Sequence, residues 1–158
     1  MLYLKSSIFC LLLTFSACSI GEYTHSNSKL IIIKTDKMKF ADLGYVKQRD
    51  KSIRLELFVA GQNVQIIEIN HLICLNEGCM LRSNFNSEYL SENYPDTILQ
   101  NIVLGTPIYN KKNLQKNEDG FEQKIQTSDV DILYRVTSKE HYFKDKKNKI
   151  LFKIKDIQ

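Results

Sequence analysis

The stretch YPDTILQNIVLGTPI, from Tyr94 to Ile108, decides the fold class because it has a helical pattern among segments that are typical of strands. Pro95 suits the first position of a helix, and Asp96 suits the positive end of the helix dipole. Gly105 and Pro107 would end the helix. Four apolar residues share one helical face, which must pack against another part of the protein: Ile98, Leu99, Ile102 and Val103.

The segments on either side of this helix alternate apolar and polar residues with a period of two, which indicates half-buried strands. Tight turns join several of these segments, and strands joined in this way pair in an antiparallel sheet. We also expect a second short helix at residues 86–91. Residues 30–34 are predicted as a short strand or as a strap that packs on the domain. The other predicted strands are 52–59, 64–69, 71–75, 130–136, 142–145 and 149–155.

A helix inserted between two groups of antiparallel strands predicts an α+β domain of mainly antiparallel β structure. Two architectures fit this content. One is a curved, open half-barrel with the short helix as a lid, and the other is an immunoglobulin-like β-sandwich. We favour the half-barrel because a sandwich does not need an amphipathic helix in mid-chain. Its interior would bind an apolar ligand and would be lined by Ile98, Leu99, Ile102, Val103, Ile132, Tyr134 and Phe152.

The N-terminus has the pattern of an exported lipoprotein. Lys5 precedes the short apolar stretch IFCLLLTF, residues 8–15, which is too brief to cross a membrane and is typical of a signal peptide. The sequence FSAC, which ends at Cys18, resembles the bacterial lipobox, and this resemblance implies cleavage before Cys18 and lipidation of its sulfur. Several acyl chains on one terminus hold a protein stably at a membrane. We therefore predict a signal peptide at 1–17, a lipidated N-terminus and flexible tether at 18–29, and a single periplasmic β-rich domain at 30–158.

Localisation and partners follow from this N-terminus. In enterobacterial sorting, aspartate after the lipidated cysteine retains a lipoprotein in the inner membrane, and this chain has Ser19 there. We therefore expect the protein to be anchored in the outer membrane and to face the periplasm. Removal of Lys5 with the signal peptide would lower the formal net charge from +4 to +3. So weak a charge in an exported protein argues against nucleic acid as a partner.

Two cysteines lie within the predicted domain, Cys74 and Cys79. In an exported protein such a pair predicts a disulfide, and the intervening residues LNEG have the composition of a turn that brings two strand ends together. A thioredoxin-type redox site needs two residues between its cysteines, whereas this pair has four. A zinc site needs four nitrogen or sulfur ligands, and only His71 lies near in sequence. We therefore favour a structural bridge.

The C-terminal half, about Tyr89 to Ile157, resembles the LolB family of outer-membrane lipoprotein receptors in the order of four segments: YLSENYPDTILQNIVLGTPI, GFEQKI, VDILYRV and HYFKDKKNKILFKIKDI. The helix of that family ends in a leucine-glycine-x-proline turn, which corresponds here to Leu104–Pro107. The resemblance implies an open, strongly curved antiparallel barrel with helices across its mouth, which binds the acyl chains of lipoproteins. This chain departs from the family in having no tryptophan and no match for the exposed apolar loop that inserts lipoproteins into the membrane.

No catalytic motif assembles in the sequence. His71 and His141 adjoin predicted strands, without a nucleophile elbow, an HExxH motif or a glycine-rich phosphate loop. We predict that the protein is not an enzyme and has no catalytic residue, metal or cofactor. The predicted function is that of a lipid-anchored outer-membrane lipoprotein that binds an acyl chain or another lipoprotein in a LolB-like half-barrel. The alternative is a non-enzymatic interaction module, an adhesin or assembly partner, built on a β-sandwich.

Overall fold

The computed structural model describes residues 25–49 and 51–157, which form one β-rich domain. The predicted signal peptide, Cys18 and the first part of the predicted tether lie outside the described residues. Eleven strands, two α-helices and a 3₁₀ turn follow one another in the described part. In chain order they are β1 (His25–Lys34), β2 (Lys39–Arg49), β3 (Ser52–Val59), β4 (Gln62–Ile69), β5 (Leu72–Leu75), β6 (Gly78–Leu81), α1 (Arg82–Tyr89), α2 (Ile98–Leu104), η2 (Tyr109–Lys111), β7 (Leu114–Asn117), β8 (Gly120–Gln126), β9 (Asp131–Thr137), β10 (Glu140–Asp145) and β11 (Ile150–Asp156).

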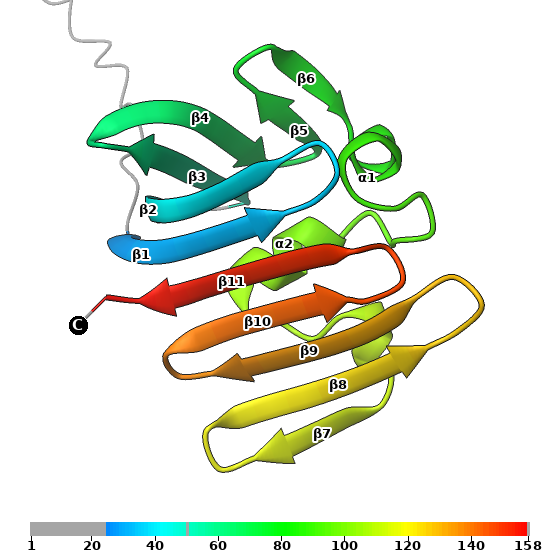
Figure 1. Ribbon diagram of the computed structural model, residues 1–158. Coiled ribbons are helices and arrows are strands. Elements are labelled where there is room, and N and C mark those ends of the chain that lie inside the picture. Colours follow the sequence, from blue (N-terminus) through cyan, green and yellow to red (C-terminus); the bar gives the residue numbers. More distant parts are fainter. Residues whose placement is uncertain (1–24, 50, 158) are drawn as a thin grey trace, which may run out of the picture.

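All of these strands belong to one antiparallel sheet (Figure 1). Strands β1 to β6 pair in chain order as one meander, and β7 to β11 pair in chain order as a second. The two meanders join where β1 lies beside β11, from Lys29 opposite Asp156 to Lys34 opposite Leu151. Among the described strands, β6 and β7 form the two edges, so the sheet is open. The predicted α+β class with mainly antiparallel strands is confirmed, and the strands form one sheet instead of the two packed sheets of a sandwich.

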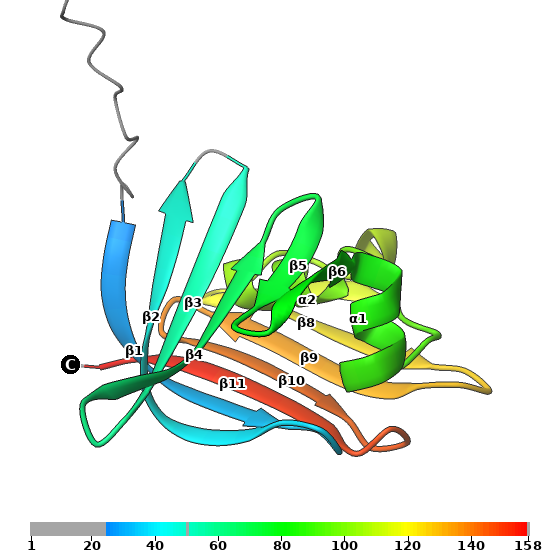
Figure 2. The same ribbon diagram turned by 90° about the horizontal axis from the view of Figure 1, so that it is seen from above.

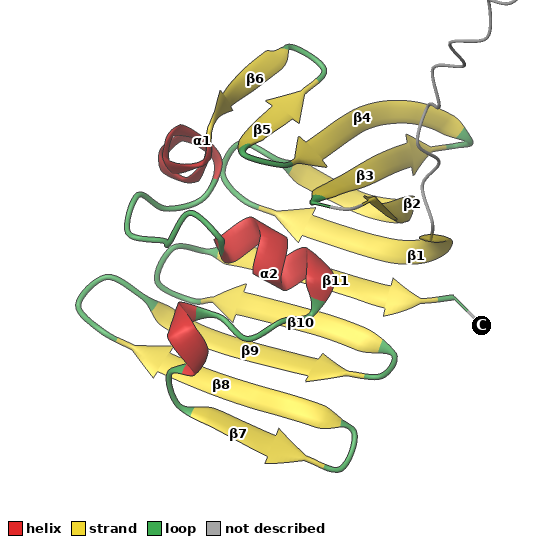
Figure 3. Cartoon of the chain, turned by 180° about the vertical axis from the view of Figure 1, so that it is seen from behind, coloured by secondary structure: helices red, strands yellow, loops and turns green. Residues whose placement is uncertain are grey.

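The sheet is curved, and both α-helices lie on its concave side. In Figure 2, β8 to β11 form one part of the sheet, and β3, β4 and β5 form a second part that turns steeply away from the first. Seen from behind, α2 lies across β10 and β11 on this side of the sheet (Figure 3). We call the concave side the inner face and the opposite side the outward face. Side chains alternate between the two faces along each strand, and those on the inner face pack with α2 into one hydrophobic core.

Helix α2 begins three residues later than the sequence predicts. Pro95 lies in the turn before the helix, where its carbonyl accepts a hydrogen bond from the N–H of Ile98 at 2.9 Å, and Thr97 is the N-terminal cap residue. The predicted end is confirmed, because Gly105 is the C-terminal cap residue with a left-handed φ of 66°. Glycine adopts this conformation without the steric cost that a side chain would add. The apolar face of α2 is therefore placed as expected, although the first turn is not.

Helix α1 also differs from its predicted range, 86–91, because it begins directly after β6. Its inner side carries Phe85 and Asn86, which are both buried. The Asn86 side chain donates hydrogen bonds to the carbonyl oxygens of Tyr94 at 3.2 Å and Pro95 at 3.1 Å. An asparagine in the helix thus holds the turn that leads into α2, and this buried polar residue makes the bounds of the helix hard to predict from the apolar pattern.

Buried polar side chains of the sheet fasten α2 and the segment after it. The hydroxyl of Tyr134 on β9 bonds the carbonyl oxygens of Asn101 at 3.0 Å and Thr106 at 3.1 Å. The side chain of Gln123 on β8 accepts from the N–H of Ile108 at 2.8 Å and donates to its carbonyl at 3.0 Å. A buried polar group that loses its partner costs roughly 1–3 kcal/mol. These bonds therefore oppose movement of α2 away from the sheet.

Strand β2 was not predicted, and β1 begins at His25, five residues before the expected domain boundary at Leu30. The inner face of β2 carries Asp42 and Gly44 between apolar residues, so the alternation is weak in the sequence. Gly44 is required for close packing, because a Cβ atom there would lie 2.6 Å from Cδ1 of Ile31 and 2.8 Å from the carbonyl oxygen of Glu56. Strands β6 and β7 were also missed, and both are short edge strands.

Candidate functional site

The predicted lining of the half-barrel forms the centre of the hydrophobic core. The structure brings the seven residues together on the inner face, with α2 contributing four of them and β9 and β11 the others. Each has an exposed fraction of at most 2%: Ile98, Leu99, Ile102, Val103, Ile132, Tyr134 and Phe152. In this arrangement they pack with one another and with the rest of the core, and an acyl chain could reach them only by displacing α2. The ligand-binding role of these residues stays a prediction.

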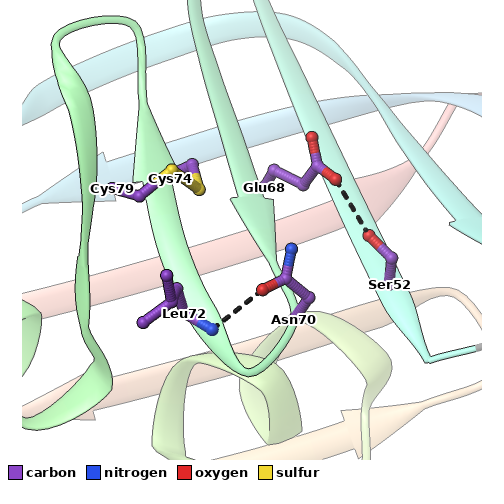
Figure 4. The surroundings of a disulfide bond; sticks show 6 residues. All are labelled: Ser52, Glu68, Asn70, Leu72, Cys74 and Cys79. Carbon is purple, nitrogen blue, oxygen red and sulfur yellow. Dashed lines mark hydrogen bonds between the residues drawn. A yellow bond between two sulfur atoms is a disulfide. The ribbon is translucent and has the colours of Figure 1, made fainter.

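The predicted disulfide is present. Cys74 on β5 and Cys79 on β6 are directly opposite each other, with their sulfur atoms 2.05 Å apart and their Cα atoms 3.9 Å apart (Figure 4). The bridge lies on the outward face, where Cys74 is also opposite Glu68 of β4. Glu68 in turn accepts a hydrogen bond from Ser52 at 3.3 Å. The disulfide therefore closes the hairpin at one edge of the sheet.

The two histidines that adjoin strands occupy different surroundings. His71 is exposed in the turn between β4 and β5, whereas His141 lies against the C-terminal end of α2. Burial lowers the pKa of His141, and the nearby charge of Lys29 lowers it further. Its Nε2 lies so close to Gly105 that a Cβ atom on that glycine would be 2.3 Å away. His141 thus belongs to the packing between β10 and α2. Among the described residues, no three His, Cys, Asp or Glu side chains are grouped so that they could hold a metal ion.

The outward face has an open groove near the C-terminal end of β11. Its volume is about 700 Å³. Leu30 on β1 is directly opposite both Leu43 on β2 and Lys155 on β11. Leu30 points outward because Ile31 and Ile33, its neighbours in the alternation, are buried on the inner face. We call this site the apolar groove, and its lining consists of Leu30, Leu43, Lys139, Lys155, Asp156 and Ile157.

The apolar groove exposes large hydrophobic side chains. The exposed fraction is 49% for Leu43 and 45% for Ile157. Exposed apolar surface that gathers in one place commonly marks a site of ligand, protein or membrane contact. A ligand with a hydrocarbon chain would gain about 25 cal/mol for each Å² of apolar surface that leaves water. The groove therefore favours an apolar chain over a polar ligand.

Two lysines give the apolar groove a positive rim. Lys139 and Lys155 are exposed, and neither forms a salt bridge with another described residue. Asp156, the acidic residue of the groove, is paired with Lys29. The carboxylate opposite Lys155, that of Glu140, is engaged by Lys153 at 3.0 Å. The two lysine charges are therefore available to an anionic group at the end of the groove.

Several other charges on the outward face are neutralised in pairs. Glu122 accepts from Arg135 at 2.9 Å and from Lys124 at 3.0 Å, and these two hydrogen bonds hold the pKa of Glu122 below its ordinary value. Lys47 pairs with Glu56 at 2.8 Å on the other half of the sheet. Lys139 and Lys155 of the apolar groove differ from these residues, because neither has a carboxylate partner among the described residues.

Sequence reasoning missed this groove for two reasons. Leu30 belongs to a run of four apolar residues, so its pattern does not show which side chains turn outward. Leu43 lies on β2, which was not predicted as a strand. The two residues become neighbours only through the pairing of β1 with β2, and Lys155 joins them only through the pairing of β1 with β11.

No protein-family model matches the chain, no curated protein is significantly similar to it, and no solved structure matches it. A relationship to the LolB family therefore stays a prediction. In the described part of the chain, none of the helices has the length and apolar character needed to cross a membrane.

Proposed function

We propose that the protein is a lipid-anchored lipoprotein of the bacterial outer membrane that binds the acyl chain of an anionic amphiphile in its apolar groove. The observation that carries this proposal is the combination of exposed Leu43 and Ile157 with two unpaired lysines. The chain would lie over the leucines, and its anionic head group would lie between Lys139 and Lys155. The lipid anchor rests on the resemblance of the sequence before Cys18 to a lipobox.

The energetics favour an amphiphile over an ion or a neutral hydrocarbon. Each CH₂ group that leaves water contributes about 0.8 kcal/mol, so a few buried groups already exceed thermal energy. Each lysine near an anionic group adds about 1 kcal/mol at low ionic strength. Both contributions act together only on a molecule that has an apolar chain and a negative head group.

This proposal keeps the predicted ligand class but moves the ligand from the inner face to the outward face. A LolB-like mode of binding would place the chain between α2 and the sheet. That space is occupied by side chains of the core. A hydrogen bond from Tyr134 holds α2, and Gln123 holds the segment that follows α2. The outward site needs no such rearrangement.

Titration with a fluorescent fatty acid tests the position of the site. The full chain carrying Cys18→Ala would be used for every variant, so that the protein's own lipid cannot compete. We expect Leu43→Asp to weaken binding at least about tenfold, because the new carboxylate is polar and has the same negative charge as the head group of the fatty acid. The control is Val64→Asp on β4, which adds the same charge at another exposed apolar position.

Two further variants, one on each face of the sheet, test which face binds the ligand. Lys139→Gln combined with Lys155→Gln should weaken binding of the fatty acid. The same double variant should bind a neutral alcohol of the same chain length as tightly as before. Ile132→Trp changes the inner face and should leave binding unchanged. If Ile132→Trp abolished binding while Leu43→Asp did not, the ligand would occupy the inner face and the proposed position would be wrong.

The lipid anchor has an independent test. Metabolic labelling with an alkyne fatty acid should modify the wild-type protein and should not modify Cys18→Ala, because the thioether forms on that sulfur. Ser19→Ala serves as the control and should be labelled normally. Equal labelling of wild type and Cys18→Ala would contradict the lipobox interpretation.

A further inference from the structure

A second open groove lies on the outward face, at the other end of β1 and β11. Its volume is about 540 Å³. Four strands (β1, β2, β10 and β11), the turn between β1 and β2, and the turn between β10 and β11 contribute to it. We call it the lysine groove, because five of its lining residues are lysines: Lys34, Lys39, Lys144, Lys146 and Lys149.

Strand pairing sets three of these lysines in one row across the sheet. Lys39 on β2 is directly opposite Lys34 on β1, Lys34 is opposite Leu151 on β11, and Leu151 is opposite Lys144 on β10. Neighbouring strands are about 4.8 Å apart, so Lys34 and Lys144 are separated by about 10 Å at their backbones. Like charges that are directly opposite in a sheet are destabilising. The row therefore has an unfavourable interaction that a bound anion would relieve.

No carboxylate of the described residues forms a salt bridge with any of the five lysines. Asp36, an exposed residue of the groove, forms no such bridge. Asp145 is fully buried, and its oxygen atoms accept from the hydroxyl of Tyr94 at 2.7 Å and from the side chain of Asn148 at 2.7 Å. The same carboxylate also accepts from backbone N–H groups of Asp131 and Lys147. Asp145 thus holds the turn, and the excess positive charge of the groove is left for a ligand.

We propose that the lysine groove binds a ligand that carries two or more phosphate groups, either free or as part of a lipid head group. A single phosphate has at most two negative charges and would reach only part of a row that extends over four strands. Lysine binds phosphate as a point charge and does not require the planar geometry that arginine imposes. Because all the basic residues of the site are lysines, it favours a flexible, highly charged anion over a carboxylate of fixed geometry.

Isothermal titration with inorganic tripolyphosphate tests the site in the full-length protein, held in phosphatidylcholine nanodiscs by the lipid anchor that we propose above. We expect saturable binding that weakens as salt is added, because the interaction is between exposed charges. Lys34→Gln combined with Lys144→Gln should weaken binding by roughly 30-fold. The matched control, Lys112→Gln with Lys116→Gln, removes two exposed lysines outside the groove and should bind as wild type does.

The source of the phosphates is decided by adding cardiolipin, which has two phosphates in its head group, to the nanodiscs. Phosphatidylglycerol discs of equal charge are the reference. If cardiolipin alone weakens tripolyphosphate binding to wild type, the ligand is a lipid head group, and if both discs behave alike, it is a free anion. The proposal is overturned if wild type shows no saturable binding, or if the control pair loses as much affinity as the groove pair. Neither result bears on the apolar groove, which is tested with other residues and another probe.

Discussion

The inner and outward faces of the sheet are made by the same strands but carry different kinds of side chain. On β1, Ile31 and Ile33 enter the core, whereas Leu30 and Lys34 line the two grooves of the outward face. The inner face is filled by side chains and fastened to α2 by hydrogen bonds. The outward face has exposed Leu43 and Ile157 at one end, and at the other it has lysines that form no salt bridge with another described residue. The comparison teaches that the inner face provides stability, and we propose that the outward face provides ligand binding.

The loss of a core side chain should give the largest change in the free energy of unfolding, and so tests the difference between the two faces most strongly. Ile102→Ala removes a fully buried residue of α2 and should lower the free energy of unfolding by about 2–5 kcal/mol, because a cavity remains. Leu43→Ala on the outward face should change it by less than about 0.5 kcal/mol. Urea unfolding followed by circular dichroism measures both values. Similar losses for the two variants would show that the faces do not differ in this way.

The disulfide provides a test at the edge of the outward face. Cys74→Ser with Cys79→Ser should lower the free energy of unfolding by about 2 kcal/mol, since the closed loop is short. The double variant should still bind the fluorescent fatty acid, because the bridge lies away from both grooves. Mass analysis after thiol alkylation should find two adducts on the wild type only after reduction. Adducts on the unreduced protein would mean that the native cysteines are free.

The smallest expected effect concerns Asp145, which reaches from the inner face to the turn beside the lysine groove. Burial raises the pKa of its carboxyl group, but hydrogen bonds from Asn148, Tyr94 and backbone N–H groups outweigh burial and hold the pKa below its ordinary value of 3.8. The ionised form is therefore stabilised by folding. This contribution is present above the unfolded pKa and is lost as the pH falls through the folded pKa.

Asp145→Asn should therefore lower stability by about 1 kcal/mol at neutral pH and should reduce the loss of stability below pH 3.8. Urea unfolding at a series of pH values measures this difference. Asp119→Asn, at an exposed position in the turn between β7 and β8, is the control. If Asp145→Asn kept the full acid sensitivity of wild type, another carboxylate would be responsible.

The sequence by itself determined the local features whose cause is local. Alternation along β3, β9 and β11 is visible because one face of each strand is buried, and Gly105 ends α2 because glycine tolerates the left-handed conformation. The disulfide could be predicted because its two cysteines are close in sequence. The start of α2 and the range of α1 could not be predicted, because the turn between the two helices is held by the side chain of Asn86.

Only the tertiary structure decided which apolar residues form the core and which remain in water. The seven residues that the sequence suggested as a ligand lining lie together in the core, where α2 packs against the inner face of the sheet and all seven are buried. The apolar groove around exposed Leu43 and the row of lysines depend on the pairing of β1 with both β2 and β11, strands from opposite ends of the chain. The alternation of apolar and polar residues indicates that a strand has two different faces. It does not report which residues of distant strands become neighbours, because that register is set by long-range packing.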